Sequence, residues 1–281
     1  MAPLRRRHIV LLSIVVTLSL IYGMWWSSQP SQPPNETGPR PTIHEGEGLE
    51  SARTAHIYDR TYRSAEEAQQ AIVRLSEQLR QYPDSSMLWY NRGNAYSFLE
   101  QWDQAIVDYT KALRFQPDDS WMYVNRGLAY QKHGELQLAL MDFTRAIELS
   151  PTWANAYANR GWIYIYLHNP DKAVPDFQTA VRLDPENPFA FNGLGVVYVM
   201  TGRPQQAVDA FGAALNIKPP AGREQEYETI RGETYNNRAA AYFNLQEYEK
   251  SRNDVQQAQA LGVQPAAGLL DRLDRVQSNR Y

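Results

Sequence analysis

The tripeptide Asn-Arg-Gly occurs three times in this chain, at residues 91–93, 125–127 and 159–161, with a spacing of 34 residues. An asparagine amide can both donate and accept hydrogen bonds, and an arginine guanidinium pairs with carboxylates and phosphates. These side chains could therefore form a polar or anion-binding site. Alternatively, the tripeptide could be the most visible part of a structural repeat, and the residues around it decide between the two.

Residues at fixed distances from the glycine favour a structural repeat. Counting from Gly93, Gly127, Gly161 and Gly195, a tyrosine follows after three residues, an alanine after 12 and again after 19, an aromatic residue after 16 and a proline after 24. A further aromatic residue lies four positions before each glycine. Spacings of four and three place these aromatic, glycine and tyrosine residues on one stripe of a first helix, and the proline ends a second helix.

This pattern resembles the tetratricopeptide repeat (TPR) family, whose 34-residue unit is a helix–turn–helix. Four copies match without a gap, at residues 86–119, 120–153, 154–187 and 188–221. The resemblance implies an all-α protein, namely a right-handed superhelical TPR solenoid whose concave groove is lined by the first helix of each repeat. It also implies that the groove binds other polypeptides.

The ends of the array are expected to be degenerate repeats, as terminal repeats usually are. Residues 49–85 form the N-terminal one, in which Ser64 and Glu67 make a capping box at the start of a helix. Residues 222–264 form the C-terminal one, with ten extra residues that lengthen its first helix and project it from the solenoid. A capping helix is expected at residues 265–281.

The arginines of the repeat are interpreted as structural. Each is followed after 16 residues by an aspartate, which gives the pairs Arg92–Asp108, Arg126–Asp142, Arg160–Asp176 and Arg238–Asp254. The fourth repeat has Leu194 and Ala210 at these positions, so the charge and its counter-charge disappear together. Because a desolvated guanidinium needs a partner, this pattern predicts an ion pair that ties the two helices of one hairpin.

The asparagines remain available for a ligand, because two residues at about 100° each turn them away from the glycine stripe. Their own stripe is mostly aromatic, aliphatic and amide, whereas a solvated face would be charged. By resemblance this stripe lines the groove, and its asparagines are similar to the amide ladder that holds peptide backbone in O-linked N-acetylglucosamine transferases. The predicted partner-binding residues are Asn91, Asn94, Phe98, Trp121, Asn125, Leu128, Asn159, Trp162, Tyr166, Phe189, Met200 and Asn237. The alternative is that the aromatic residues only pack between neighbouring first helices.

The N-terminal segment is of a different kind. Residues 9–26 contain no charged residue, and a helix of that length, at about 1.5 Å per residue, matches a bilayer core. Three arginines precede it and two tryptophans end it, which are typical flanks of a transmembrane helix. These features predict a basic cytoplasmic stub at 1–8, a single transmembrane signal anchor at 9–26 and a proline-rich linker at 27–48. The TPR domain would then be extracytoplasmic, in the periplasm if the protein is bacterial; a cleaved signal peptide is the alternative.

Composition narrows the function. The 281 residues include no cysteine, and their five histidines lack metal-ligand spacing, so no metal site is expected. A net charge of −3 gives no electrostatic footprint for nucleic acid. Without a recognisable catalytic constellation, we expect no enzyme activity, no cofactor and no small-molecule substrate.

The sequence therefore favours a membrane-tethered TPR scaffold that binds a protein or peptide partner, for example an assembly or biogenesis factor. The alternative is a structural subunit of a stable membrane protein complex. Such a subunit would be held by its transmembrane helix and by the lengthened helix expected at residues 224–245.

Overall fold

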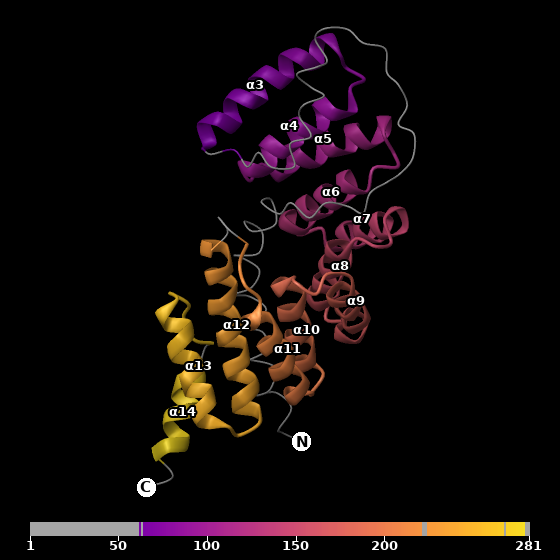
Figure 1. Cartoon of the computed structure of the whole chain (residues 1–281). Coiled ribbons are helices and arrows are strands. Elements are labelled where there is room, and N and C mark those ends of the chain that lie inside the picture. Colours follow the sequence, from indigo (N-terminus) through magenta and orange to yellow (C-terminus); the bar gives the residue numbers. More distant parts are fainter. Residues whose placement is uncertain (1–61, 63, 221–223, 267, 279–281) are drawn as a thin grey trace. The chain divides into compact units, whose positions relative to one another are not determined.

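The structure is a computed structural model, and it describes residue 62 and residues 64–220, 224–266 and 268–278. Every regular element in this part of the chain is an α-helix, from α3 to α14 (Figure 1), which confirms the predicted all-α class. The predicted stub, signal anchor and linker, residues 1–48, lie outside the described residues. Within the described residues, no helix combines the length and the apolar character that a bilayer crossing requires.

The chain forms two compact units that meet in the sequence between Ala156 and Tyr157. We refer to the described residues up to Ala156 as the N-terminal unit and to those from Tyr157 onward as the C-terminal unit. The two units are built from the same kind of helical hairpin, and each is described by itself.

The N-terminal unit contains helices that pack against one another in the order of the chain. They are α3 (Ala65–Gln81), α4 (Ser86–Phe98), α5 (Trp102–Phe115), α6 (Ser120–His133) and α7 (Leu136–Leu149). The hairpins α4–α5 and α6–α7 correspond to the predicted repeats 86–119 and 120–153. Ser64 is the N-cap of α3 and accepts a hydrogen bond from the backbone N–H of Glu67 at 3.1 Å, as the capping box predicts.

The C-terminal unit continues the same arrangement, with α8 beginning three residues before the unit boundary. Its helices are α8 (Ala154–Tyr166), α9 (Pro170–Leu183), α10 (Pro188–Met200), α11 (Pro204–Asn216), α12 (Glu224–Asn244), α13 (Tyr248–Ala260) and α14 (Leu269–Ser278). Pro170 and Pro204 are the first residues of α9 and α11. A proline is well suited to that place, because its missing N–H would have no partner inside the helix.

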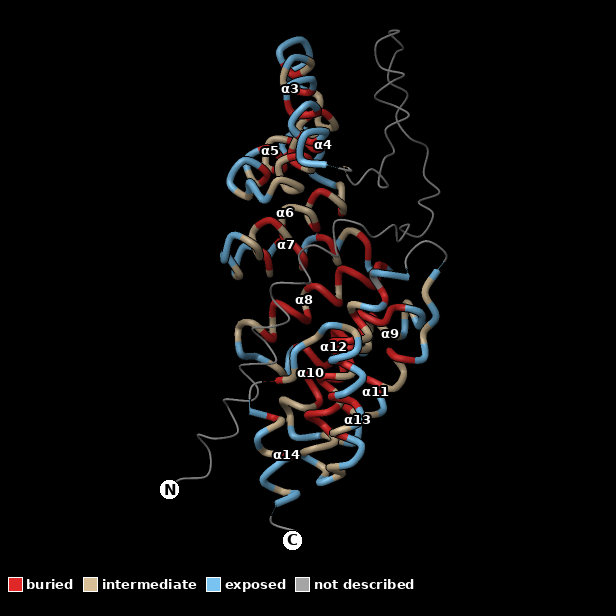
Figure 2. The backbone as a smooth tube through the Cα atoms, turned by 90° about the vertical axis from the view of Figure 1, so that its left-hand side faces the viewer, coloured by how far each residue is buried: buried red, intermediate tan, exposed pale blue. Residues whose placement is uncertain are grey.

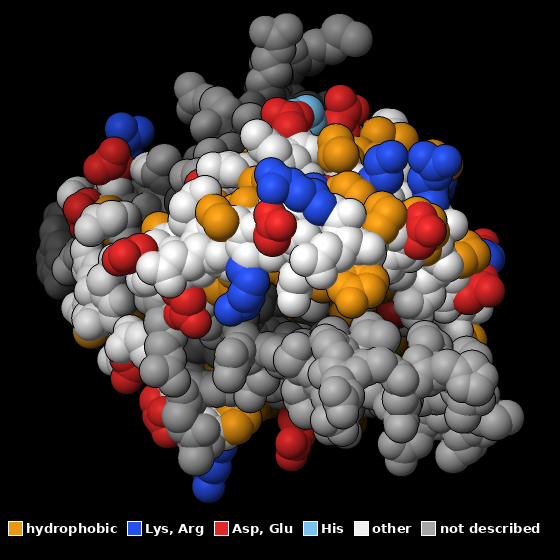
Figure 3. Space-filling view, turned by 90° about the horizontal axis from the view of Figure 1, so that it is seen from above, with side chains coloured by type: hydrophobic (Ala, Val, Ile, Leu, Met, Phe, Trp, Pro, Cys, Tyr) orange, Lys and Arg blue, Asp and Glu red, His pale blue; other side chains and the backbone are white. Residues whose placement is uncertain are grey.

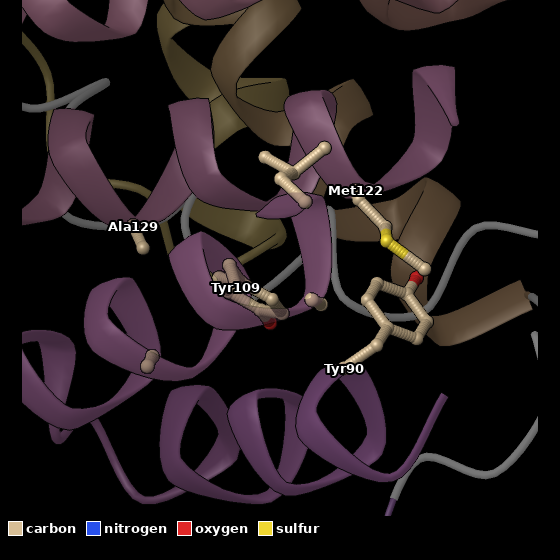
Figure 4. Close-up of a cluster of buried hydrophobic side chains, with 7 residues drawn as sticks. Tyr90, Tyr109, Met122 and Ala129 are labelled. Carbon is tan, nitrogen blue, oxygen red and sulfur yellow. The ribbon is translucent and has the colours of Figure 1, made fainter. Parts of the chain in front are cut away.

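Each full repeat is closed by its glycine and by the aromatic residue 16 positions later. A Cβ atom added to Gly93 would lie 2.8 Å from the ring of Tyr109, and one added to Gly127 would lie 2.9 Å from the ring of Phe143. Any larger residue would push the ring away, so glycine allows the two helices to approach. The buried core around the Tyr109 ring includes Tyr90, Met122 and Ala129 (Figure 4).

The C-terminal end of the array is covered by helices with a modified pattern. Helix α12 has 21 residues against 13 in α10, so the extra residues lengthen the first helix of this repeat as predicted. This stretch does not stand free of the unit, because Tyr227 and Ile230 are buried. Helix α14 forms the predicted cap, with Leu269 and Leu273 buried in a cluster with Val255.

Candidate functional site

The four predicted arginine–aspartate pairs are all present, each with two hydrogen bonds inside one hairpin. Arg92 donates from Nε and Nη2 to the two carboxylate oxygens of Asp108, at 2.7 and 2.8 Å. The corresponding N···O distances for Arg126, Arg160 and Arg238 are 2.7–2.9 Å. The planar guanidinium matches a carboxylate in this geometry. These arginines therefore hold the hairpins together and are poor candidates for binding an external anion.

Two of these arginines also reach the preceding repeat, which the sequence analysis did not predict. The remaining Nη1 of Arg92 donates to the hydroxyl of Ser76 at 2.9 Å, and that of Arg126 donates to Thr110 at 3.2 Å. Both hydroxyl residues lie 16 positions before the arginine. Each of these two guanidinium groups thus links two repeats, and the 34-residue spacing of Ser76 and Thr110 was the available signal.

Aromatic rings cover the faces of the paired guanidinium groups. Arg126 lies over the rings of Tyr123 and Tyr130, with its Cζ 5.6 and 5.7 Å from the two ring centroids. Arg92 and Arg238 have the same arrangement, with centroid distances of 4.8–5.7 Å. A guanidinium is stabilised over an aromatic face. This contact gives the aromatic residues four before and three after each glycine a second purpose.

Burial acts on both members of a pair. The hydrogen bond to Asp108 raises the pKa of Arg92, while burial opposes it. Burial raises the pKa of Asp108 and of Asp142, although their arginines work against it. The aspartate side chains are 2% and 6% exposed and the arginines 17%, so we take desolvation as the dominant effect on the carboxylates. Such a pair adds little net stability, but losing one partner is costly.

The asparagines of the repeat are not equivalent in the structure. Asn125 donates from Nδ2 to the hydroxyl of Tyr90 at 2.5 Å, and Asn237 donates from Nδ2 to Oδ1 of Asn192 at 3.2 Å. Each acceptor lies in the preceding repeat, so these amides already link neighbouring first helices. Asn159 is 3% exposed, and its Nδ2 has no hydrogen-bond acceptor among the described residues. A ladder of equal amides is therefore not what the structure contains.

In the N-terminal unit, the predicted stripe is partly open to solvent. Its six predicted residues are all half-buried: Asn91, Asn94, Phe98, Trp121, Asn125 and Leu128. Trp121 packs on Trp153 with ring centroids 4.3 Å apart, and Asn94 accepts a hydrogen bond from Tyr109 at 2.8 Å. Burial lowers the pKa of Lys132, the cation on this stripe. This surface is mainly apolar and amide, with side chains that a partner could contact.

In the C-terminal unit, the same stripe is largely filled. Asn159, Trp162, Phe189 and Asn237 are 2–3% exposed, whereas Tyr166 and Met200 are half-buried. The Trp162 ring lies 5.6 Å from the ring of Phe177 and 5.7 Å from that of Phe189. In Figure 2 the buried stretches run along α8 and α10. The packing alternative describes these four residues, and they do not form an open surface.

Gly193 provides a physical reason for this filling. It stands where the preceding repeats have asparagine, and a Cβ atom added to it would overlap the ring of Phe177. A Cβ atom on Gly195 would likewise overlap Phe211. With two glycines on α10, rings from both neighbouring second helices approach the backbone closely. The aromatic residues of the predicted stripe then pack into the interior.

The turn inside each hairpin is a further regular feature that the sequence analysis missed. The residue seven positions after the packing glycine has a positive φ, at Glu100 (57°), Gly134 (93°), His168 (57°) and Gly202 (73°). Only glycine adopts this conformation without cost. The two glycines, 68 residues apart, were the available signal, but glutamate and histidine at the other two positions concealed it.

Family models for the tetratricopeptide repeat match residues 86–119, 122–152 and 154–187. The chain carries tetratricopeptide repeats. TPR arrays are scaffolds for protein–protein interaction, and no positive evidence of catalysis accompanies these matches. Among the described residues, no group of His, Asp and Glu side chains is placed to hold a metal ion. No curated protein sequence matches this chain.

Solved TPR structures share the fold. A chain of the APC/C hetero-tetramer Cut9–Hcn1 superposes with a TM-score of 0.60 at 21% identity; the match covers 69% of this chain and 36% of that chain, so this protein spans about a third of its length. A TPR protein from Parabacteroides merdae gives 0.60 at 21% identity, over 76% of this chain and 81% of that one. YrrB, described as a TPR protein with an unusual peptide-binding site, gives 0.54 at 19% identity, over 72% and 97%. At these identities the likeness establishes an all-α TPR fold.

Proposed function

We propose that this protein is a membrane-tethered TPR scaffold that binds a segment of a partner polypeptide on the first-helix stripe of its N-terminal unit. The observation that carries the proposal is the difference in exposure along the stripe. Its six predicted residues on α4 and α6 are half-buried, whereas Asn159, Trp162, Phe189 and Asn237 are buried. We therefore restrict the binding surface predicted from the sequence to the N-terminal unit.

The chemistry of this surface suits a peptide ligand. Phe98, Trp121 and Leu128 offer apolar surface for side chains, and the Asn91 amide can pair with main chain of any sequence. Apolar surface on a soluble repeat array often marks a partner site. The stripe has Lys132 as its cation in this unit, so we expect recognition by shape and apolar contact more than by charge.

The proposed tether is residues 9–26, with the N-terminus in the cytoplasm and the repeats on the far side of the membrane. The uncharged run, its arginine and tryptophan flanks and the proline-rich linker support this topology. A fusion of a reporter that is active only outside the cytoplasm, placed after residue 281, tests it. Activity of the reporter only in the cytoplasm would overturn the topology.

The alternative, a structural subunit of a membrane complex, keeps one supporting observation. Helix α12 is lengthened, and a longer helix could dock on a neighbouring protein. However, Tyr227 and Ile230 on that stretch are already buried within this chain, while the exposed Glu224, Gln225 and Glu228 are polar. The scaffold is therefore the preferred proposal.

A pull-down with the full chain and with residues 49–281 distinguishes the two functions. The scaffold predicts that both forms retain the same partner, and that Asn91→Ala with Leu128→Asn reduces its recovery. Asn253→Ala, an exposed change in the C-terminal unit, is the matched control. Trp162→Ala is unsuitable, because Trp162 is a core residue. Association of the full chain alone would instead favour the structural subunit.

A further inference from the structure

The outer face of the N-terminal unit carries a row of exposed apolar side chains. Among the described residues, the exposed large apolar side chains are Val73, Tyr82, Val107, Phe115, Leu138 and Met141, and all of them lie in this unit. Three of them, Val73, Val107 and Met141, are 34 residues apart and 56–66% exposed. They occupy one position of the repeat on successive second helices, α3, α5 and α7.

The repeat itself does not require an apolar residue at this position. The next repeats have Pro175, Asp209 and, after the ten-residue insertion, Asn253 in the same place. All three are exposed, like their counterparts in the N-terminal unit. A single exposed valine is ordinary on a protein surface. Three large apolar residues in a row, confined to one unit, are better explained by a partner that covers them.

Charge at the centre of this row indicates what kind of partner would fit. On α5, Lys111 and Arg114 lie four and seven residues after Val107, and Phe115 follows them. These spacings place the two cations on the same side of the helix as Val107. Among the described residues, neither cation has a carboxylate within ion-pair distance; the acid at the start of α5, Asp103, pairs with His133 at 2.9 Å.

The helices on either side have already neutralised their own charges. On α3, Arg80 pairs with Glu77 at 2.7 Å, and on α7, Arg145 pairs with Glu148 at 3.0 Å. The cations without a printed partner are therefore concentrated on the central helix, between apolar side chains. Figure 3 shows apolar side chains beside basic ones over the described part of the end where α3 lies.

We propose that the outer face of α3, α5 and α7 docks an acidic amphipathic helix of a partner protein. Its apolar face would cover Val73, Val107 and Met141, and carboxylates at its edge would pair with Lys111 and Arg114. Unpaired cations beside an apolar surface favour a ligand that combines apolar burial with negative charge. This site is separate from the first-helix stripe, so a partner of either surface leaves the other available.

The test uses the full chain and a labelled synthetic helix of about 18 residues, with leucines on one face and glutamates at its edges. Binding is measured by fluorescence anisotropy. We expect the glutamate peptide to bind, and two comparison peptides to fail: one with lysine in place of glutamate, and one of equal composition with the leucines scattered. Raising the ionic strength from about 0.05 to about 0.5 M should weaken the binding.

Two pairs of substitutions locate the site. Lys111→Glu with Arg114→Glu, and separately Val107→Ser with Met141→Ser, should each weaken the glutamate peptide by roughly tenfold. These side chains lie at the surface, so the helical circular dichroism should be unchanged. Asp209→Ser with Asn253→Ser, at the same repeat positions in the C-terminal unit, is the matched control. Leu128→Asn on the first-helix stripe should also leave this binding unchanged, which separates this proposal from the proposed function.

Three results would overturn the proposal. The first is no binding of the glutamate peptide, and the second is equal binding of the lysine peptide. The third is binding that the four outer-face substitutions leave unaltered. If vesicles of phosphatidylcholine with phosphatidylglycerol bind through Lys111 and Arg114 while the peptide does not, the face is a lipid contact and the proposed partner is wrong.

Discussion

Leu128 and Trp162 occupy the same place in successive repeats, one residue after the packing glycine, but their surroundings differ. Leu128, in the N-terminal unit, is half-buried, whereas Trp162, in the C-terminal unit, is 2% exposed and contacts Phe177 and Phe189. The outer faces differ in the same direction. All the exposed large apolar side chains of the described residues belong to the N-terminal unit.

This difference shows that one repeat pattern can build either a surface or a core. The packing glycine, the aromatic residue 16 positions later and the arginine–aspartate pair fix the hairpin in both units. The positions between them are left to vary. In the C-terminal unit they hold large aromatics that fill the interior, and in the N-terminal unit they leave side chains accessible on both faces.

The largest expected effect tests the difference directly. Trp162→Ala should lower the free energy of unfolding by about 3–5 kcal/mol, because it leaves a cavity in a packed aromatic cluster. Leu128→Ala, at the same repeat position, should cost about 1 kcal/mol, because its side chain is already partly solvated. Denaturant unfolding of both variants measures this. Equal costs would show that the two units are packed alike and would remove the basis of the comparison.

The second prediction concerns a feature that should be the same in both units. Asp142→Ala should cost about 3 kcal/mol, because it leaves the guanidinium of Arg126 without its partner. The double change Arg126→Leu with Asp142→Ala copies the fourth repeat and should recover most of this loss. A double-mutant cycle measures the coupling. The same cycle on Arg160 and Asp176 is the matched test in the C-terminal unit, and a coupling near zero in either would contradict a structural pair.

The third prediction uses the turn inside the hairpin. Glu100 in the N-terminal unit and His168 in the C-terminal unit both have a φ of 57°, which strains a residue with a Cβ atom. Glu100→Gly and His168→Gly should each raise the free energy of unfolding by about 1 kcal/mol, and Gly134→Ala should lower it by about 1 kcal/mol. Thermal or denaturant unfolding measures the three changes. Loss of stability in the first two would show that those side chains contribute more than the strain they cause.

The smallest effect concerns the second hydrogen bond of the arginine. Arg92 and Arg126 bond to hydroxyl groups, whereas the residue nearest to Nη1 of Arg238 is Gly212, whose added Cβ would lie 4.0 Å away. Gly212→Ser should supply the missing acceptor. Serine is ordinarily less favourable than alanine inside a helix by about 0.5 kcal/mol, so we expect Gly212→Ser to be at least as stable as Gly212→Ala. A lower stability of the serine variant would argue against the bond.

Much of the fold was predictable because it depends on short, repeated spacings. The helix starts at Pro170 and Pro204, the cap at Ser64 and the arginine–aspartate pairs all follow from residues within one repeat. The second bond of Arg92 and Arg126 was missed because its acceptor lies in the preceding repeat. The left-handed turn was missed because residues other than glycine occupy it at Glu100 and His168.

The binding stripe was predictable in place but not in exposure. Its residues lie on the first helices, as the spacing from the packing glycine indicates. Whether such a residue is open depends on side chains that arrive from other helices, and the spacing does not contain this information. Phe177, which contacts Trp162 and crowds Gly193, shows how a ring from a second helix decides the matter for residues far away in the sequence.

The sequence by itself determined the repeat length, the hairpin, the charge pair and the face on which the asparagines lie, because each follows from distances along one or two helices. The tertiary structure alone decided that the asparagines differ from one another, that Trp162 and Phe189 are core residues, and that Val73, Val107 and Met141 remain uncovered. These properties depend on neighbours that converge from separate repeats, where a single glycine in place of an asparagine changes how closely the helices approach. Gly193 makes this change in the C-terminal unit, and the N-terminal unit keeps its asparagines and its accessible stripe.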